Sequence, residues 1–303
     1  MSNVGTPAAP PAHPEATGRP PAATQRRRIR LVAFDLDGTL LSPDLALCDP
    51  VLRAVARLVA EGVKVVIVTG RMHRTAEAFA RRLGLENQPL VSFNGAMVKR
   101  VGGDDLWWYR PIDTAPALDV LSFLAGHGLQ PLVFDDDRVY AHAPGVVAEQ
   151  YRLISGVAPE YVGDLVARVG AEAGPVRPTK ILQVQSPDLM PALRAEAEDR
   201  FGRVLNVTTS YPFFLEFMNH LVSKGRALAE VCRRLGLEAQ DVAAFGDGMN
   251  DLDMIEWAGL GVAMEHGPRE LIAAADAVAQ GPPGEGVARF VEENLLGPGG
   301  GGS

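Results

Sequence analysis

The sequence predicts an α/β fold in which a smaller α+β domain is inserted into a parallel-sheet core. Strand-like apolar runs alternate with helical periodicity near both ends of the chain, and this alternation is typical of parallel βαβ units. The middle of the chain instead shows the order β-α-β-β twice, which indicates a separate α+β unit. The length of 303 residues leaves room for about two domains.

The predicted core is built from two parts of the chain. The first part has the order strand, helix, strand, helix, strand, over residues 29–36, 49–62, 63–70, 72–85 and 89–96. The second part starts with a helix and then alternates strand and helix, over residues 223–237, 241–248, 250–259, 260–265, 268–276, 277–280 and 285–296. Between them, strands are predicted at 106–112 and 180–186, helices at 115–128 and 187–202, and two-stranded stretches at 129–143 and 204–219.

These patterns predict the division of the chain into domains. We expect residues 29–95 and 223–297 to form the core and residues 96–222 to form the inserted domain. The Pro/Ala-rich residues 1–28 predict a disordered tail, and the Gly-rich residues 298–303 predict a flexible one.

The composition argues against several classes of protein. The net charge is −8 and no apolar stretch is long enough to span a bilayer, so we expect neither a nucleic-acid partner nor a membrane partner. The two cysteines, Cys48 and Cys232, are too few for a disulfide scaffold and lack metal-ligand spacing. Reduced thiols and the lack of a signal-peptide segment predict a cytoplasmic protein.

Polar residues follow the predicted core strands, at the edge where an open parallel sheet binds its ligand. Asp35, Asp37, Thr69, Gly70, Asp247, Asn250 and Asp251 follow strands, and Lys224 joins them from the start of the helix predicted over 223–237. Carboxylates alone would repel one another, and a divalent cation that prefers oxygen ligands, such as Mg²⁺, relieves this repulsion. The lysine and the backbone amides at helix starts suit a phosphate group.

Each of these motifs alone has a simpler interpretation. Asp35 and Asp37 could cap a turn, a Thr-Gly pair is usually a turn, and Lys224 could point into solvent. The combination favours a functional site, because each motif follows an apolar run and the motifs come in this order. Arg71 and Asn94 fall near the same edge, and both contact with the substrate and a structural role stay open for them.

The motifs "DLDGTL", "VTGR", "SKG" and "GDGMND" together resemble those of the haloacid dehalogenase-like (HAD) hydrolase superfamily. The large insert between "FNGA" and "SKG" is similar to the Cof-type subgroup, which carries a type II cap. The resemblance covers the chain from Leu31 to Leu296. It implies a Rossmann-like HAD core and an α+β cap domain that roofs the site and supplies most substrate contacts.

The resemblance also implies a role for each acidic residue of the motifs. Asp35 is expected to be the nucleophile that forms an aspartyl-phosphate, and Asp37 to be the general acid and base. Mg²⁺ is expected to bind the side chains of Asp35 and Asp247 and the backbone carbonyl of Asp37. Asp251 is expected to orient Lys224 or to support the metal site.

The phosphate-binding groups implied by the resemblance are the backbone amides of Leu36 and Gly70 and the side chains of Thr69, Lys224 and Asn250. The implied function is a magnesium-dependent phosphatase that acts on a small phosphorylated metabolite, such as a sugar, nucleotide or cofactor phosphate. A phosphomutase of the same fold and a non-catalytic sensor of a phosphorylated metabolite are the alternatives. The motifs select neither a physiological substrate nor an oligomeric state.

Overall fold

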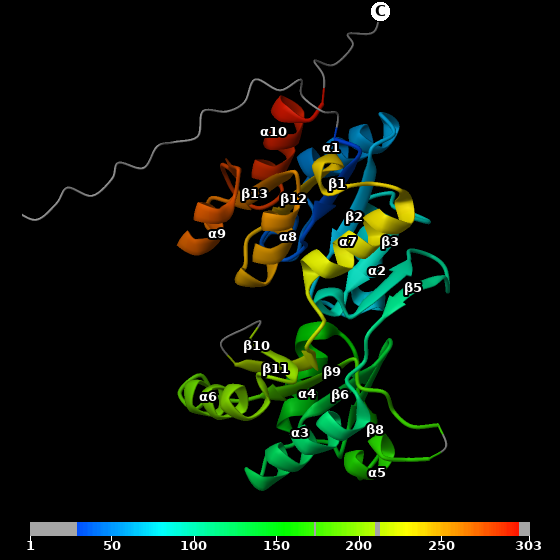
Figure 1. Ribbon diagram of the computed structural model, residues 1–303, viewed down its shortest axis with the longest axis vertical. Helices are drawn as coiled ribbons and strands as arrows, with labels where there is room; N and C mark the ends of the chain where they lie inside the picture. The colour runs from blue at the N-terminus through cyan, green and yellow to red at the C-terminus, as the bar shows by residue number, and fades with distance from the viewer. Residues whose placement is uncertain (1–28, 173, 210–212, 297–303) are drawn as a thin grey trace, which may run out of the picture.

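A computed structural model describes residues 29–172, 174–209 and 213–296 of the chain (Figure 1). The tails predicted for residues 1–28 and 298–303 lie outside these described residues. The described part contains two sheets, one of eight strands and one of six. In Figure 1 the larger sheet with its helices lies above the smaller one, and the chain passes between the two units after β5 and before α7.

The larger sheet has the strand order β14-β13-β12-β1-β2-β3-β4-β5. Its strands are β1 (Leu31–Phe34), β2 (Lys64–Val68), β3 (Pro89–Ser92), β4 (Met97–Arg100), β5 (Leu106–Tyr109), β12 (Val242–Gly246), β13 (Leu260–Met264) and β14 (Ala277–Ala279). The strands from β14 to β3 are parallel, whereas β4 and β5 are antiparallel to their neighbours. The predicted parallel α/β core is therefore confirmed.

Helices cover both faces of this sheet, which explains why its strands are apolar without alternation. Residues Val32 and Phe34 of β1 pack toward α1 (Asp49–Ala60), α2 (His73–Arg82) and α10 (Glu285–Asn294). Leu31 and Ala33 point to the other face, toward α7 (Lys224–Leu235), α8 (Leu252–Trp257) and α9 (Arg269–Ala274). None of the helices described in the structure has both the length and the apolar character that crossing a membrane requires.

The smaller sheet has the strand order β10-β11-β9-β6-β7-β8. Its elements are α3 (Thr114–Gly126), β6 (Leu132–Asp135), β7 (Arg138–Ala141), α4 (Val146–Ser155), β8 (Glu160–Tyr161), α5 (Leu165–Val169), β9 (Lys180–Val184), α6 (Met190–Phe201), β10 (Leu205–Thr209) and β11 (Phe214–Asn219). Helices α3, α5 and α6 pack on one face of this sheet. Helix α4 packs on the other face, which looks toward the core.

The structure differs from the predicted division into domains at one boundary. The inserted domain was expected to start at residue 96, but β4 and β5 extend the larger sheet through antiparallel pairing with β3. The smaller sheet is built only from residues after Tyr109. The strand predicted over 106–112 is present, but apolar spacing cannot show which of two sheets a strand joins. The elements β4, α4, β8 and α5 were not predicted.

The two units are packed together through one apolar cluster. It joins Phe93 and Met97 of the core to Phe134 and Leu182 of the smaller sheet, all buried. Phe93 directly follows β3, so the cluster lies beside the strand ends that carry the predicted site. The fold thus holds the smaller unit against the carboxyl-end edge of the parallel sheet, where ligands bind in such folds.

Candidate active site

Three of the predicted residues form a buried charged group at the end of β1. Lys224 Nζ lies 2.6 Å from Asp35 Oδ1 and 2.5 Å from Asp251 Oδ1. The side chains of Lys224 and Asp251 are each 1% exposed, and that of Asp35 is 6% exposed. Burial of three charges is tolerated only because the ammonium group pairs with both carboxylates.

Local structure fixes the position of the lysine. Helix α7 begins at Lys224, and the side chain of Ser223 caps it by accepting a hydrogen bond from the Arg226 amide. Gly95, at a φ of +102°, lies so close to this helix start that a Cβ atom there would overlap the carbonyl oxygen of Ser223. The turn after β3 therefore packs closely against the start of α7. This contact positions Lys224 at the edge of the sheet.

A second carboxylate cluster overlaps the first. Single oxygen atoms of Asp35, Asp247 and Asp251 lie within 4.8 Å of one another, a spacing that could hold a metal ion. Thr39 Oγ1 donates a hydrogen bond to Asp247 Oδ1 at 3.1 Å. Three carboxylates around one point match the hard oxygen ligands that Mg²⁺ prefers. The residues present therefore fit the divalent cation that the motifs predict, with Asp251 also among the candidate ligands.

Backbone geometry holds this cluster in place. Asp251 Oδ2 accepts hydrogen bonds from the amides of Asp247 at 3.0 Å and Gly248 at 2.9 Å, which closes the turn after β12. Gly38 adopts a φ of +82° and approaches Asp247 so closely that a Cβ atom would overlap its carboxylate. A glycine at this position is therefore required for the loops after β1 and β12 to meet.

The electrostatics of the cluster favour added positive charge. Burial raises the pKa of Asp35 well above its ordinary value, and the charges of Asp251 and Asp247 raise it further against the opposing effect of Lys224. Burial and the charge of Asp251 raise the pKa of Asp247 to about 6. Burial opposes the charge on Lys224, but Asp251 and Asp35 outweigh it, so the pKa of the lysine is raised. A bound cation would stabilise the ionised carboxylates.

We expect the free energy of unfolding, measured without metal, to fall with rising pH in one window. This window lies between the pKa of Asp247 in the unfolded chain and its pKa in the folded protein. The unfolded chain releases this proton near the ordinary pKa of 3.8, while the folded protein keeps it until about pH 6. The folded state therefore binds more protons in this window, and its stability decreases with rising pH. Urea titrations of the parent and of Asp247→Asn across the window test this, because the variant should lack this part of the slope. Identical slopes in the two proteins would contradict the assignment.

Asp37 lies beside the buried group and has a different environment. Its side chain is 33% exposed and forms a two-point ion pair with Arg71, with distances of 2.7 Å from Nε and 2.5 Å from Nη2. The Arg71 amide in turn donates a hydrogen bond to Thr69 Oγ1 at 3.2 Å. The Arg71 guanidinium thus holds Asp37, and contact between Arg71 and the substrate stays a prediction.

Of the remaining predicted groups, Thr69, Gly70 and Asn250 meet around Asn94, and Leu36 lies directly after β1. Asn250 Nδ2 donates a hydrogen bond to Asn94 Oδ1 at 3.0 Å, and the Asn94 amide donates to the carbonyl of Thr69 at 2.9 Å. A Cβ atom on Gly70 would lie 2.9 Å from Asn94 Oδ1, so this close approach also needs glycine. Leu36 is fully buried, and its carbonyl accepts the amides of the turn over residues 39–41.

Asn94 is the member of this group to which the sequence assigned no definite role. It is 4% exposed and has a left-handed φ of +52°, next to Phe93 at +51°. Such backbone is unusual outside glycine and often marks a functional turn. The Asn-Gly pair in "FNGA" is a sequence signal for this turn. It does not show that the side-chain amide of Asn94 reaches Asn250.

Comparison with known proteins places this geometry in a family. The sequence model of the family described as haloacid dehalogenase-like hydrolase matches residues 32–291, which include every strand end described above. The chain belongs to this HAD-like hydrolase family. The resemblance stated from the motifs is therefore confirmed, as is the HAD-type α/β fold.

Curated relatives of this HAD-like hydrolase are named phosphatases. The chain is 30% identical over 269 residues to 5-amino-6-(5-phospho-D-ribitylamino)uracil phosphatase YitU of Bacillus subtilis, an alignment that covers 87% of this chain and 96% of the relative. It is 29% identical over 273 residues to pyridoxal phosphate phosphatase YbhA of Escherichia coli, with coverages of 88% and 99%. These relatives support the predicted enzyme class, a HAD-type phosphatase.

Solved structures agree with the fold. A Thermotoga maritima protein matches with a TM-score of 0.79 and 27% identity, over 88% of this chain and 98% of the other. A haloacid dehalogenase-like hydrolase from Bacillus subtilis matches with a TM-score of 0.75 and 26% identity, over 88% of this chain and all of the other. Both matches span the core and the smaller unit, so the inserted sheet is part of the shared architecture.

Proposed function

We propose that this HAD-like hydrolase is a magnesium-dependent phosphatase that hydrolyses a small organic phosphomonoester through an aspartyl-phosphate. The observation that carries the proposal is the buried Asp35 carboxylate, held 2.6 Å from Lys224 Nζ with two further carboxylates beside it. The hydrogen bond from Lys224 fixes the orientation of the Asp35 carboxylate, and burial shields this carboxylate from water. A carboxylate that only caps a turn would need neither the lysine nor the neighbouring acids.

The proposed reaction uses the two acids after β1 in turn. An Asp35 oxygen attacks phosphorus, a bond forms between them, and the ester P–O bond breaks. Asp37 gives its proton to the leaving oxygen and then takes a proton from the water that attacks the phosphoryl group. The Asp35–phosphorus bond breaks in that second step and releases inorganic phosphate. Arg71 would hold Asp37 through its two-point contact while the carboxylate is ionised, and the protonated acid that donates to the leaving oxygen would keep only one of these two hydrogen bonds.

Other groups of the site would hold the transferring phosphoryl group. Lys224 lies within reach of Asp35 and supplies a fixed positive charge that neutralises phosphoryl oxygens. Thr69, Gly70 and Asn250 come from two other strand ends and would donate further hydrogen bonds to it. The amide of Leu36, next to the nucleophile, completes this proposed set.

The metal has a defined place in this proposal. Asp35 and Asp247 would hold Mg²⁺ through their side chains and Asp37 through its backbone carbonyl, with Asp251 close enough to contribute. When bound, the ion supplies positive charge that balances the clustered carboxylates and the phosphoryl oxygens. Thr39, which hydrogen-bonds Asp247, would orient that ligand.

We expect phosphate release that requires Mg²⁺ and stops reversibly when EDTA removes it. The test is inorganic phosphate release from a panel of sugar, nucleotide and cofactor phosphates, including the two substrates named for the relatives above. Each assay is run with Mg²⁺, with EDTA, and with EDTA followed by excess Mg²⁺. Equal release in EDTA would contradict the metal assignment. No release from any compound would contradict the phosphatase assignment and favour a phosphomutase or a non-catalytic sensor.

A further inference from the structure

The smaller unit contacts the core at a short segment that leads from the proposed active site into α2. Residues 71–74 form this segment, which lies after β2 and includes the first two residues of α2. At one end, Arg71 holds Asp37 through contacts of 2.7 and 2.5 Å. At the other end, the Arg74 amide donates a hydrogen bond of 2.7 Å to Oδ1 of Asp137, which belongs to the smaller unit. The segment therefore connects the proposed general acid with the smaller unit.

Asp137 supplies a cap that α2 does not provide for itself. The residue before the helix is Met72, which makes no capping hydrogen bond through its side chain, and the first turn contains no acidic residue. A carboxylate that accepts from the second amide of a helix replaces an N-cap side chain, and its charge complements the positive end of the helix dipole. Arg74 provides that second amide. The start of α2 is therefore held by a residue of the other unit.

The turn that carries Asp137 is itself fixed by hydrogen bonds. Asp136 and Asp137 connect β6 to β7, and Asp136 has a left-handed φ of +52°. The Asp136 amide donates a hydrogen bond to Thr179 Oγ1 at 3.2 Å. Just before the turn, Asp135 Oδ1 accepts a hydrogen bond of 3.0 Å from the hydroxyl of Tyr109, the last residue of β5. A turn held in this way presents Asp137 to α2 in a defined position.

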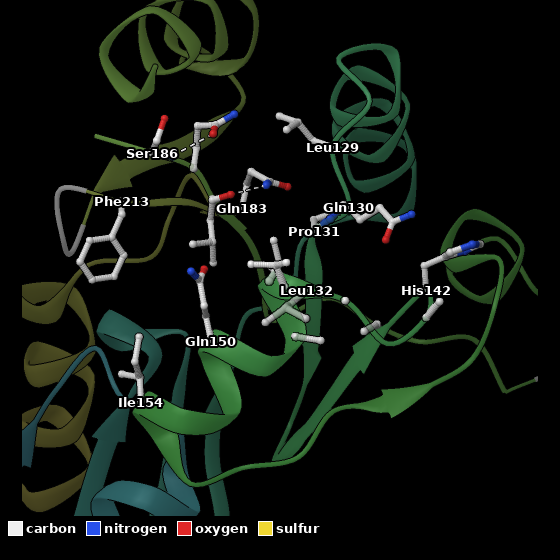
Figure 2. A pocket seen from close by; sticks show the side chains of 18 of the residues that line it. Leu129, Gln130, Pro131, Leu132, His142, Gln150, Ile154, Gln183, Ser186 and Phe213 are labelled. Carbon is white, nitrogen blue, oxygen red and sulfur yellow. Dashed lines mark hydrogen bonds between the residues drawn. The ribbon is translucent and has the colours of Figure 1, made fainter. Parts of the chain in front are cut away.

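A second element of the smaller unit, helix α4, contacts the same segment. The hydroxyl of Tyr151 donates to Met72 Sδ at 3.5 Å, and both side chains are buried. Tyr151 also packs edge-on against Phe134 of β6, with 5.3 Å between the ring centres. Gln150 and Ile154 of the same helix line a separate hollow, shown in Figure 2, which Tyr151 does not line. The smaller unit therefore holds both the middle and the end of the segment 71–74.

We propose that Asp137 is a positioning residue for the general acid. By fixing the start of α2, it fixes the backbone that carries Arg71, and Arg71 in turn orients Asp37. This assignment rests on the proposed function, in which Asp37 is the acid and base. Contact with the smaller unit then supports proton transfer to the leaving oxygen, whereas the attack of Asp35 on phosphorus does not depend on it.

The test compares two substrates of similar size whose leaving groups differ in their need for a proton. Nitrophenolate leaves p-nitrophenyl phosphate without a proton, whereas phenyl phosphate releases a more basic oxygen that the acid must protonate. With excess Mg²⁺, we expect Asp137→Ala to lower kcat/KM roughly tenfold for phenyl phosphate and less than about twofold for p-nitrophenyl phosphate. The ratio of the two kcat/KM values, measured on one preparation, does not depend on the fraction of protein that is folded.

Three further variants serve as the rescue and the controls. Asp137→Asn keeps an oxygen that can accept from the Arg74 amide, so it should recover most of the loss. Asp188→Ala truncates an exposed aspartate elsewhere on the smaller unit, and Gln150→Ala changes an exposed residue of α4, so both should leave the two kcat/KM values unchanged. An equal loss for the two substrates in Asp137→Ala, or no loss for either, would overturn the proposal. No recovery in Asp137→Asn would also overturn it.

Asp37→Asn separates failure of this proposal from failure of the proposed function. It should show the same selective loss to a larger extent, because the acid itself is missing. Adding Asp137→Ala to it should then leave the ratio of the two kcat/KM values unchanged, and a further change would overturn the positioning role. A selective loss in Asp37→Asn without one in Asp137→Ala would overturn the positioning role alone. Equal losses for the two substrates in Asp37→Asn would overturn the acid role of Asp37 and the positioning role with it.

Discussion

Asp35→Asn is expected to lower phosphate release by at least roughly 10⁴-fold, because the amide cannot attack phosphorus. The fold should be retained. Asparagine keeps an oxygen that can accept the hydrogen bond from Lys224 Nζ, now 2.6 Å from Asp35 Oδ1. The substitution also removes a carboxylate whose pKa is raised by burial. It therefore creates no new unpaired charge. Phosphate release with excess Mg²⁺ and the urea midpoint, measured on the same preparation, check both expectations.

The matched control is Asp104→Asn, the same chemical change at a fully exposed carboxylate of the core. It should alter neither turnover nor stability. If Asp35→Asn retained the activity of the parent, the assignment of the nucleophile would be wrong. If both activity and the urea midpoint were lost, the effect would be structural, and detection of a phosphoryl adduct on Asp35 would decide the role of this residue.

Lys224→Met is expected to lower both activity and stability. The methionine fills a similar volume but leaves Asp35 and Asp251 buried without their shared cation, since Lys224 Nζ lies within 2.6 Å of both. Removing one partner from a buried ion pair costs about 3–5 kcal/mol, and we expect a loss of that size in the free energy of unfolding at pH 7. Urea titration measures this loss, with Lys64→Met at an exposed strand end as the control.

A double variant separates electrostatics from packing. Adding Asp251→Asn to Lys224→Met removes one of the two stranded carboxylates and should recover part of the lost stability. It should not recover activity, because the positive charge beside Asp35 is still missing. A Lys224→Met protein as stable as the parent would show that the buried charges do not depend on this lysine. No recovery in the double variant would assign the loss to packing instead.

The sequence predicted the core well for physical reasons. Buried parallel strands must be apolar on both faces, so the runs that became β1, β2 and β12 were evident without any structure. The extent of the core sheet was less evident. β4 and β5 are short antiparallel strands, and their pairing with β3 depends on long-range contacts rather than on local pattern. For the same reason the second sheet begins later than residue 96.

The site was predictable to the extent that strand ends determine it. Asp35, Asp247 and Lys224 follow strands or begin a helix, and parallel topology brings such positions together. The pairing of Asp37 with Arg71 and the link from Asn250 to Asn94 were not predictable. Both depend on side-chain conformations, and the link to Asn94 depends also on left-handed backbone after β3, neither of which sequence spacing specifies.

In the proposed mechanism Asp35 carries the phosphoryl group and Asp37 moves the protons. The most direct test is to mix the Asp37→Asn protein with p-nitrophenyl phosphate and Mg²⁺, quench with acid, and measure the mass of the tryptic peptide 31–53. This leaving group needs no protonation, so the first step should proceed while hydrolysis of the intermediate stalls. We expect one added phosphoryl group, which fragmentation places on Asp35. Nitrophenol release without this adduct, or an adduct on another residue, would contradict it.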